Sequence, residues 1–438
     1  MTKKITIIGG GLAGCEAAWQ AARSGVAVRL YDMKPERFSP AHHSPHLAEL
    51  VCSNSFRAAD PANAVGLLKE EMRRLDSLII GAAMATQVPA GRALAVDRAA
   101  FSARITETLA AHPAIELIRE EVLELPPENG EPVVLATGPL TSDAMAASLI
   151  TFMGEAGLAF YDAIAPIVVG ESLNRDIIYE KSRYQDGPGD YLNCPLEKDE
   201  YFNFISELRN GQCVPPRPFE EPRYFEGCLP IEVLLARGDE TLRFGPMKPV
   251  GLENPQSGRR PYAVAQLRRE DAAGLGYNMV GFQTKLRHGE QKRIFRLIPG
   301  MERAEFLRLG SIHRNTFIRA PNILTASLQT RKRPTLFIAG QLAGVEGYVE
   351  SAAMGLVAGI NAARLATNRA PLTPPAETAL GALIAHLTAS EPQHFQPSNV
   401  TFGLFPPLPP GKMGKKERGR TRAAIALAAL EVWRNLLD

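Results

Sequence analysis

Residues Lys4–Gly14 read KITIIGGGLAG, a short apolar strand followed by a turn with the spacing G-x-G-x-x-G. We expect a helix to leave this turn and to point its first backbone N–H groups into the space beyond the strand. Glycines at this spacing permit a tight turn, close approach of backbone to a phosphate, and close packing of helix on strand. The pattern predicts a pyrophosphate-binding turn, and the residues expected to hold the cofactor are Gly9, Gly10, Gly11, Leu12, Ala13 and Gly14.

A second strand is predicted over Val26–Tyr31, and it ends at Asp32. This acid stands about 20 residues beyond the turn, where a carboxylate accepts hydrogen bonds from the ribose hydroxyls of a dinucleotide. Strand, glycine turn, helix, second strand and acid therefore follow one another in the order of a dinucleotide-binding unit. A glycine-rich loop alone is a weak signal, whereas the complete unit predicts a doubly wound α/β fold.

A second strand–glycine–helix unit is predicted far downstream. The apolar run at 335–339 leads into Gly340 and Gln341, and a helix rich in small residues follows over 347–366. Such a second unit separates FAD enzymes from simple NAD enzymes, because it serves the flavin end of the cofactor. Many flavoproteins carry Asp where this chain has Gln341, whose uncharged amide still offers hydrogen bonds to a hydroxyl or phosphate oxygen. We add Gly340 and Gln341 to the predicted cofactor-binding residues.

The fold predicted from these units is α/β, a doubly wound FAD-binding fold of the glutathione-reductase type with an inserted α+β domain. Residues 1–168 and 331–438 are expected to form the FAD-binding domain in two parts. Residues 169–330, with Pro-rich turns and few long helices, are expected to form the inserted substrate domain. A buried strand is predicted at 133–138 beside the first unit, and an amphipathic helix is predicted at 421–437.

Composition narrows the class of protein. The chain has 438 residues, of which 45% are hydrophobic and 22% charged, enough to bury at least one large core. The first strand starts close to the amino terminus, and no apolar run approaches the roughly 20 residues of a membrane span, so a cytoplasmic location is predicted. The five cysteines are widely spaced without C-x-x-C, which predicts neither a disulfide framework nor a metal site.

Charge is distributed unevenly although the formal net charge is only +2. Residues 259–333 contain 16 Lys and Arg against five acids, and residues 412–422 contain six basic residues against Glu417. The two segments therefore carry +11 and +5, which leaves −14 for the remainder. This distribution is typical of a surface that binds a polyanion. The alternative is that the arginines pair with acids elsewhere in the fold.

Two cysteines stand in turn-like settings rather than in apolar stripes. Cys52 precedes Ser-Asn-Ser, and Cys228 follows a glycine and stands close to a proline. Loops are where cations and helix N-termini can lower the pKa of a thiol and make it a nucleophile. The alternative is that each is a small buried apolar residue. Cys15 lies inside the first helix and is assigned to packing, while Cys194 and Cys213 stay unassigned.

Several sequence blocks, spread over essentially the whole chain, resemble those of the folate- and FAD-dependent tRNA (uracil-5-)-methyltransferases. This family is related to the flavin enzymes that modify the wobble uridine of tRNA. The blocks follow one another without large gaps: the turn at 9–14, VCSNSF at 51–56, FEGCLPIE at 225–232, FGPMKPVGL at 244–252 and AGQLAGVEGY at 339–348.

The resemblance implies transfer of a one-carbon unit from 5,10-methylenetetrahydrofolate to the T-loop uridine 54 of tRNA, which yields 5-methyluridine. It implies FAD as cofactor, reduced by NADH or NADPH, and tRNA as the partner held at its elbow by the basic segments, with no membrane and no obligatory protein partner. Uracil C5 is a poor nucleophile, so a thiolate must first add to C6, and a base must later remove the C5 proton.

By this resemblance Cys228 is the nucleophile that adds to C6. Cys52 is then a second catalytic thiol, acting as a general acid or base or in handling the methylene carried on the flavin. Lys248 and the block 278–285, which contains Gln283 and Thr284, are plausible contacts of folate or uracil, with structural support as the alternative.

Three other functions are weighed. The related wobble-uridine enzymes share the glycine turn and paired cysteines but are much longer than 438 residues. A pyridine nucleotide-disulfide oxidoreductase needs two redox cysteines a few residues apart, which this sequence lacks. A flavin-fold protein that binds tRNA without turnover would bind RNA and form no product. Oligomeric state, reductant preference, folate-binding residues and the division of roles between the thiols do not follow from the sequence.

Overall fold

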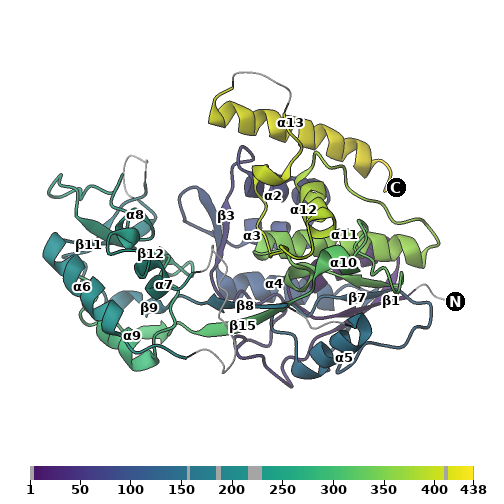
Figure 1. Cartoon of the computed structure of the whole chain (residues 1–438), viewed down its shortest axis with the longest axis horizontal. Helices are drawn as coiled ribbons and strands as arrows, with labels where there is room; N and C mark the ends of the chain where they lie inside the picture. The colour runs from purple at the N-terminus through teal and green to yellow at the C-terminus, as the bar shows by residue number, and fades with distance from the viewer. Residues whose placement is uncertain (1–3, 155–157, 184–188, 216–228, 409–412, 438) are drawn as a thin grey trace.

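The computed structural model describes residues 4–154, 158–183, 189–215, 229–408 and 413–437. Cys228, one of the two predicted catalytic thiols, lies outside the described residues. Figure 1 shows two parts of unequal size, the larger of which contains both the first and the last described residues.

The larger part is built on a parallel sheet of five strands. In spatial order they are β16 (Leu336–Ile338), β7 (Val133–Leu135), β1 (Lys4–Ile8), β2 (Ala27–Tyr31) and β6 (Ile115–Ile118). The strand predicted at 133–138 is thus confirmed beside β1, with Ile7 opposite Val134. Since β16 pairs with β7 in parallel, the downstream unit completes the sheet that the amino-terminal unit begins.

Helices of the larger part pack on this sheet or on one another. They are α1 (Leu12–Arg23), α2 (Ala64–Arg74), α3 (Leu78–Ala85), α4 (Arg98–Ala110), α5 (Asp143–Met153), α11 (Tyr348–Ala366) and α12 (Ala379–Ala389). A small antiparallel sheet of β3 (Ser55–Ala58), β5 (Ala93–Val96) and β4 (Gln87–Val88) lies beside them. Helix α2 ends at Arg74, the chain turns at 75–77, and the side chain of Ser77 caps α3.

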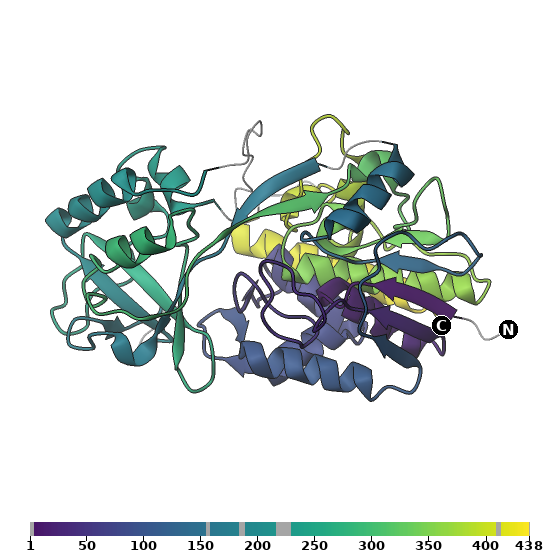
Figure 2. The same cartoon turned by 90° about the horizontal axis from the view of Figure 1, so that it is seen from below.

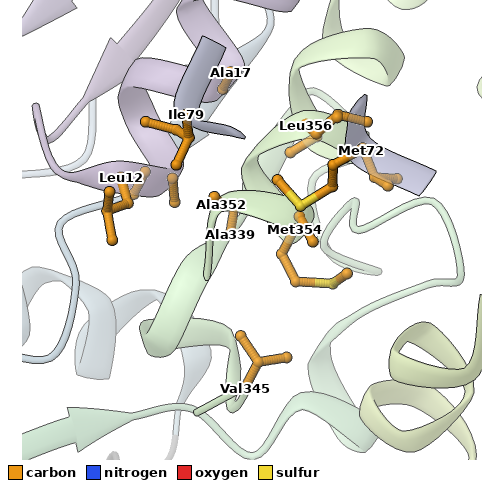
Figure 3. Close-up of a cluster of buried hydrophobic side chains, with 14 of the residues drawn as sticks. Leu12, Ala17, Met72, Ile79, Ala339, Val345, Ala352, Met354 and Leu356 are labelled. Carbon is orange, nitrogen blue, oxygen red and sulfur yellow. The ribbon is translucent and has the colours of Figure 1, made fainter. Parts of the chain in front are cut away.

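Helices α1 and α11 pack unusually closely. A Cβ on Gly355 would come within 2.1 Å of the Ala13 carbonyl oxygen, so only glycine allows this approach. Figure 3 shows Leu12 and Ala17 of α1 near Ala352 and Leu356 of α11, within one buried apolar cluster. The two predicted glycine units are therefore held together through their helices.

The smaller part contains a six-stranded sheet in which all neighbours are antiparallel. In spatial order its strands are β10 (Tyr179–Glu180), β11 (Tyr191–Leu196), β12 (Ala263–Arg269), β13 (Gly276–Met279), β9 (Ile167–Val169) and β14 (Phe306–Arg308). Helices α6 (Lys198–Asn210), α7 (Ile231–Leu235), α8 (Thr241–Phe244) and α9 (His288–Phe295) accompany it, and its apolar residues form a core of their own.

A two-stranded ribbon joins the two parts. Its strands are β8 (Leu158–Ala163) and β15 (Ile312–Phe317), which pair antiparallel along six residues. Figures 1 and 2 show this ribbon running from the six-stranded sheet into the larger part. The short helix α10 (Ala320–Ile323) follows β15 and leads back toward β16.

The last helix, α13 (Lys415–Arg434), begins six residues before the predicted start at 421. The basic run is therefore largely helical, because Lys, Glu and Arg are good helix formers and hold the helix without an apolar stripe. It packs against the larger part, where a Cβ on Gly419 would meet the Ala62 carbonyl oxygen at 2.2 Å. Lys416, Arg418 and Arg420 are exposed on it.

Candidate active site

A cavity opens at the carboxyl ends of the parallel strands, where β1 and β7 end. This is the position at which open α/β sheets bind their ligands. Eight of the predicted cofactor residues line it: Gly9, Gly10, Gly11, Leu12, Ala13, Asp32, Gly340 and Gln341. Gly14 does not line it, because it faces the strand instead, where a Cβ would lie 1.8 Å from the Gly9 carbonyl oxygen.

The turn before α1 fits the pyrophosphate of FAD. Gly11 is the N-cap residue of α1 and no side chain caps this helix, so its first N–H groups stay available to an anion. A Cβ on Gly11 would meet nothing within 4 Å, whereas a Cβ on Gly10 would lie 2.1 Å from Asp32 Oδ2. This turn at 9–11, the pyrophosphate cradle, is thus open on the side that faces the ligand and tightly packed on the side that faces Asp32.

Asp32 directly follows β2 and lines the same cavity. Its Oδ1 accepts a hydrogen bond from the Lys34 backbone N–H at 2.7 Å, and the carboxylate is 6% exposed. Burial raises the pKa of Asp32, and the neighbouring charge of Lys34 opposes that shift. The position is suitable for accepting hydrogen bonds from ribose hydroxyls.

Gly340 and Gln341 stand on the opposite wall, at the end of β16. Gly340 has φ +74°, and a Cβ there would lie 2.8 Å from the Cβ of Ala13, so the two glycine units meet directly. The Gln341 Nε2 donates to Glu346 Oε2 at 2.5 Å. This contact orients the amide in the wall of the cavity.

Cys52 lies beside this cavity and is held by Tyr348, the first residue of α11. The Tyr348 hydroxyl oxygen accepts hydrogen bonds from the backbone N–H groups of Cys52 at 2.9 Å and Ser53 at 3.2 Å. Two N–H donors occupy both lone pairs of this oxygen, so its proton is directed to Cys52 Sγ, 2.9 Å away. Tyr348 and Val51 both line the cofactor cavity, which places the thiol at its edge.

The charge of Tyr348 is fixed by its surroundings. Burial of its hydroxyl raises the pKa of Tyr348 well above its usual range, and the neighbouring Cys52 thiol adds to the shift. The hydroxyl therefore keeps its proton and remains a donor to the sulfur. A sulfur that receives a hydrogen bond is stabilised in its anionic form.

The segment that carries Cys52 is tied to the six-stranded sheet. Arg268 of β12 donates from Nε to Asn54 Oδ1 at 2.9 Å and from Nη2 to Ser53 Oγ at 2.7 Å. The Asn54 Nδ2 in turn donates to the Arg269 carbonyl oxygen at 2.9 Å. These bonds fix the two residues that follow the thiol.

An ion pair joins the larger part to Glu270, the residue that follows β12. Arg98, at the start of α4, donates from Nε and Nη2 to Glu270 Oε2 at 2.9 and 2.6 Å. Its Nη1 donates to the carbonyl oxygen of Leu50, two residues before the thiol. The Cys52 segment is therefore held from both sides by residues that contact the six-stranded sheet.

Sequence reasoning did not find Tyr348, Arg98, Arg268 or Glu270. A signal existed only for Tyr348, which ends one of the blocks shared with the family. The predicted contact Thr284 is instead internal, since its hydroxyl donates to Glu232. Lys248 is exposed, and its carbonyl oxygen accepts from Arg183 Nη2 at 2.6 Å.

Among the described residues, Cys15 and Cys194 have surroundings unlike those of Cys52. Cys15 is buried with its Sγ donating to the Gly10 carbonyl oxygen at 3.2 Å, and burial raises the pKa of its thiol. Cys194 is likewise buried in the core of the smaller part. Within the described ranges, no group of three or more His, Cys, Asp or Glu is arranged to hold a metal ion. No helix among the described residues is long and apolar enough to cross a bilayer.

Much of the positive charge of 259–333 is used inside the protein. Arg268 and Arg333 are each 6% exposed, and Arg333 donates to the carbonyl oxygens of Pro126 and Pro127. Arg296 donates to the Ala304 carbonyl oxygen, and Arg293 pairs with Glu207 and Glu290. The charge surplus of this segment is therefore in part structural.

Comparison with known proteins gives the family of the chain. Residues 4–370 match the profile of the family described as "Glucose inhibited division protein A". A protein of Desulfotalea psychrophila named methylenetetrahydrofolate--tRNA-(uracil-5-)-methyltransferase TrmFO is 61% identical over 98% of this chain and 97% of its own. Relatives of the same name in Pelotomaculum thermopropionicum and Geobacter sulfurreducens are 57% and 58% identical, each over 99% of both chains. The chain belongs to the TrmFO family.

The fold of this TrmFO family member is similar to a solved structure of GidA from Aquifex aeolicus. The TM-score is 0.71 at 17% identity, and the match covers 99% of this chain and 73% of that chain. The predicted α/β fold of the FAD-binding type is confirmed by this similarity and by the parallel sheet.

Proposed function

We propose that the chain transfers a one-carbon unit from 5,10-methylenetetrahydrofolate to C5 of a uracil in tRNA and thereby forms 5-methyluridine. One observation carries this proposal: a cysteine, Cys52, receives a hydrogen bond from Tyr348 at the edge of a cavity built to hold FAD. Membership of the TrmFO family gives the reaction in which such a thiol is needed.

The cradle residues Gly9 to Ala13 would hold the pyrophosphate of FAD, with Asp32 at the ribose and Gly340 and Gln341 on the opposite wall. When bound, FAD supplies the hydride that completes the methyl group, and NADH or NADPH is the source of that hydride. The protein positions this chemistry by packing α1 against α11, since both helices begin at the cavity.

The thiols have separate roles in the proposal. Cys228 adds to uracil C6 and makes C5 nucleophilic, as the family motif implies. Cys52 acts as the base that removes the C5 proton from uracil, because the hydrogen bond from Tyr348 supports its thiolate form. The hydrogen bonds around its segment hold the sulfur in place. Arg268 and Arg98 position the Cys52 segment on either side of the thiol.

The RNA is proposed to be the T-loop of tRNA, with the target uridine at position 54 turned out of the folded elbow. The six-stranded sheet with its helices, which makes up most of the predicted domain at 169–330, is proposed to meet the RNA. The exposed Lys416, Arg418 and Arg420 of α13 support phosphate binding by the carboxy-terminal segment. We further propose that the enzyme acts in the cytoplasm and needs no protein partner.

Incubation of the FAD-loaded protein with unmodified tRNA, methylenetetrahydrofolate and NADPH tests the proposal. Mass spectrometry of the digested RNA should detect 5-methyluridine in the T-loop and nowhere else in the RNA. Omission of folate or of the reductant is the control and should abolish product. Binding of tRNA without any product under complete conditions would favour a non-catalytic RNA-binding protein.

The Cys228→Ala variant separates the two thiols. It should bind tRNA with an affinity close to that of the wild-type protein and form no covalent adduct with RNA, because the C6 nucleophile is missing. Cys194→Ala serves as the matched control, since this thiol is buried in the core of the smaller part. A normal adduct yield with Cys228→Ala would contradict the assignment of the nucleophile.

A further inference from the structure

One face of the six-stranded sheet carries polar side chains that point away from its apolar core. Arg268 of β12 is opposite Asn278 of β13, and Asn278 is opposite Ile167 of β9. Ile167 is in turn opposite Arg308 of β14, after a bulge that displaces the register. Directly opposed residues share a face of a sheet. With Glu270, two residues beyond Arg268, these form what we call the polar face: Arg268, Glu270, Asn278 and Arg308.

The polar face meets the segment that carries Cys52. Arg268 binds Ser53 and Asn54, and Glu270 binds Arg98. Arg308 interacts electrostatically with Cys52, Tyr348, Arg98 and Glu270, and also with His313. The face is therefore directed at the thiol rather than at bulk solvent.

Three members of the polar face contain buried atoms without a hydrogen-bond partner anywhere in the described part of the chain. These atoms are Nε and Nη2 of Arg308, Nδ2 of Asn278 and Oε1 of Glu270. Asn278 is 4% exposed and Glu270 is 6% exposed. Buried polar groups are nearly always paired, and leaving one unpaired is costly. A cluster of such groups beside a reactive thiol indicates a ligand that pairs them.

The free atoms define the chemistry of that ligand. Nε and Nη2 of an arginine form one donor edge, and Arg98 uses the same pair of atoms on Glu270. The polar face thus offers donors from Arg308 and Asn278 and one acceptor from Glu270. The pairing edge of uracil presents the complement, with O2 and O4 as acceptors and N3–H as a donor.

Other rings fit less well. A pterin presents two adjacent donors, its 2-amino group and N3–H, and needs two carboxylate oxygens, but Glu270 Oε2 is already occupied by Arg98. The pyrimidine ring of a flavin has the same edge as uracil. However, the residues that line the cofactor cavity lie at 8–145 and 340–351, and none comes from the six-stranded sheet.

From this arrangement we propose that the polar face binds the pairing edge of the target uracil, with Arg308 and Asn278 on its two carbonyl oxygens and Glu270 on N3–H. This inference deepens the proposed function and rests on it for the identity of the base. The four atoms are covered by protein in this structure, so the base must displace the side chains that cover them, while the Arg98–Glu270 ion pair is kept. A base bound this way is presented to the thiols at its C5–C6 side, opposite N3.

The experiment measures equilibrium binding rather than turnover. Transcripts of the tRNA carry uridine, 2-thiouridine or 4-thiouridine at the target position, and each competes with labelled uridine-containing tRNA for the FAD-loaded protein. Sulfur is a poorer acceptor than oxygen, so wild-type protein should bind each thio-substituted RNA about ten- to thirtyfold more weakly. The variants Asn278→Leu and Arg308→Met each remove donors to one carbonyl oxygen. For one of the two thio-substituted RNAs, each variant should therefore bind the thio-substituted and the uridine-containing RNA with affinities that differ by less than about twofold.

Asn193→Leu is the matched control. Asn193 lies on β11 of the same sheet and is fully buried, and its Nδ2 donates to the carbonyl oxygens of Tyr179, Lys181 and Tyr191. This variant should lower the melting temperature and keep the discrimination of the wild type. Asn278→Leu should melt at or above the wild-type temperature, because an unpaired amide is replaced by an apolar group of similar size.

Several results would overturn the inference. Unchanged discrimination in both variants would mean that the polar face does not touch the base. A fall in FAD affinity with unchanged discrimination would assign the face to the flavin ring, and a raised KM for methylenetetrahydrofolate would assign it to the pterin. Failure of the wild-type protein to form 5-methyluridine would remove the proposed function, whereas the binding comparison would still decide whether this face recognises the base.

Discussion

The parallel sheet and the six-stranded sheet differ in which part of the residue forms the site. At the parallel sheet the cofactor meets mainly backbone, with the bare turn at 9–11 open to the cavity and Gly340 on the opposite wall. At the six-stranded sheet the functional groups are side chains, among them Arg268, Asn278 and Arg308. Backbone sites tolerate few changes of residue, whereas side-chain sites depend on which strands are brought together. Three substitutions test this difference, and a fourth tests the stability of the larger part.

The largest effect is expected on the backbone side, at Gly10. In Gly10→Ala the new Cβ would lie 2.1 Å from Asp32 Oδ2 and 2.5 Å from Leu47 Cδ2, so the turn and the ribose-binding carboxylate must both move. Affinity for FAD should fall about a hundredfold, as measured by flavin fluorescence. Gly81→Ala is the control, because a Cβ there meets nothing within 4 Å. Full retention of FAD by Gly10→Ala would show that the cradle is looser than its packing indicates.

Tyr348→Phe tests the junction between the two regions. The ring stays, while Cys52 Sγ loses its donor and the N–H groups of Cys52 and Ser53 lose their acceptor. The value of kcat for RNA methylation should fall about thirtyfold with KM for tRNA nearly unchanged. Tyr262→Phe, which removes a hydroxyl bonded to Glu240 in the smaller part, should leave kcat unaffected. An equal loss in both variants would argue for general destabilisation.

Arg268→Ala tests the side-chain region alone. It removes the bonds to Ser53 and Asn54 and leaves Asn54 Oδ1 without this donor, so the Cys52 segment should become less well ordered. We expect about a tenfold lower kcat with unchanged FAD affinity, and Arg268→Lys should recover only part of it because lysine cannot make the paired contact. A fall in FAD affinity of similar size would contradict the separation of the two regions.

The smallest effect is expected at Lys69, a buried side chain of the larger part that serves stability. Its Nζ donates to the carbonyl oxygens of Phe56 and Ala58 at 2.8 and 2.6 Å. Burial, with the nearby charge of Arg57, lowers the pKa of Lys69 to about 7 from an ordinary value of 10.5. Between these values the unfolded chain holds a proton that the folded chain does not, so the free energy of unfolding rises with pH, and this contribution is lost as pH falls toward 7.

Urea unfolding of wild type and Lys69→Met between pH 7 and 10 measures this contribution. The wild-type free energy of unfolding should rise by at most about 1.4 kcal/mol per pH unit from this one proton, and Lys69→Met should lack that rise. The exposed Lys416→Met is the control and should follow the wild type. Parallel pH curves for wild type and Lys69→Met would mean that Lys69 stays charged in the folded protein.

The difference between the backbone site at the parallel sheet and the side-chain site at the six-stranded sheet explains what could be predicted from the sequence. The cradle followed from the sequence because its turn, helix and acid are set by local spacing, and the structure places Gly9 to Ala13 and Asp32 on one cavity. The contact of Cys52 with Tyr348 spans 296 residues, and that of Arg268 with Ser53 spans 215. No local period encodes such pairs, because they depend on how two sheets meet. The surplus of arginines was likewise visible, but only the fold shows that Arg268 and Arg333 are buried.

The β8–β15 ribbon restricts how the two regions can move. Its six residue pairs run in unbroken register from Ile312 opposite Ala163 to Phe317 opposite Leu158. Sliding one region along the other would break this ladder, whereas a two-stranded ribbon twists and bends without losing a pair. The ribbon therefore leaves rotation as the available degree of freedom. The junction would open as a hinge does, widest at the edge farthest from the ribbon, and would return to the same register each time it closes.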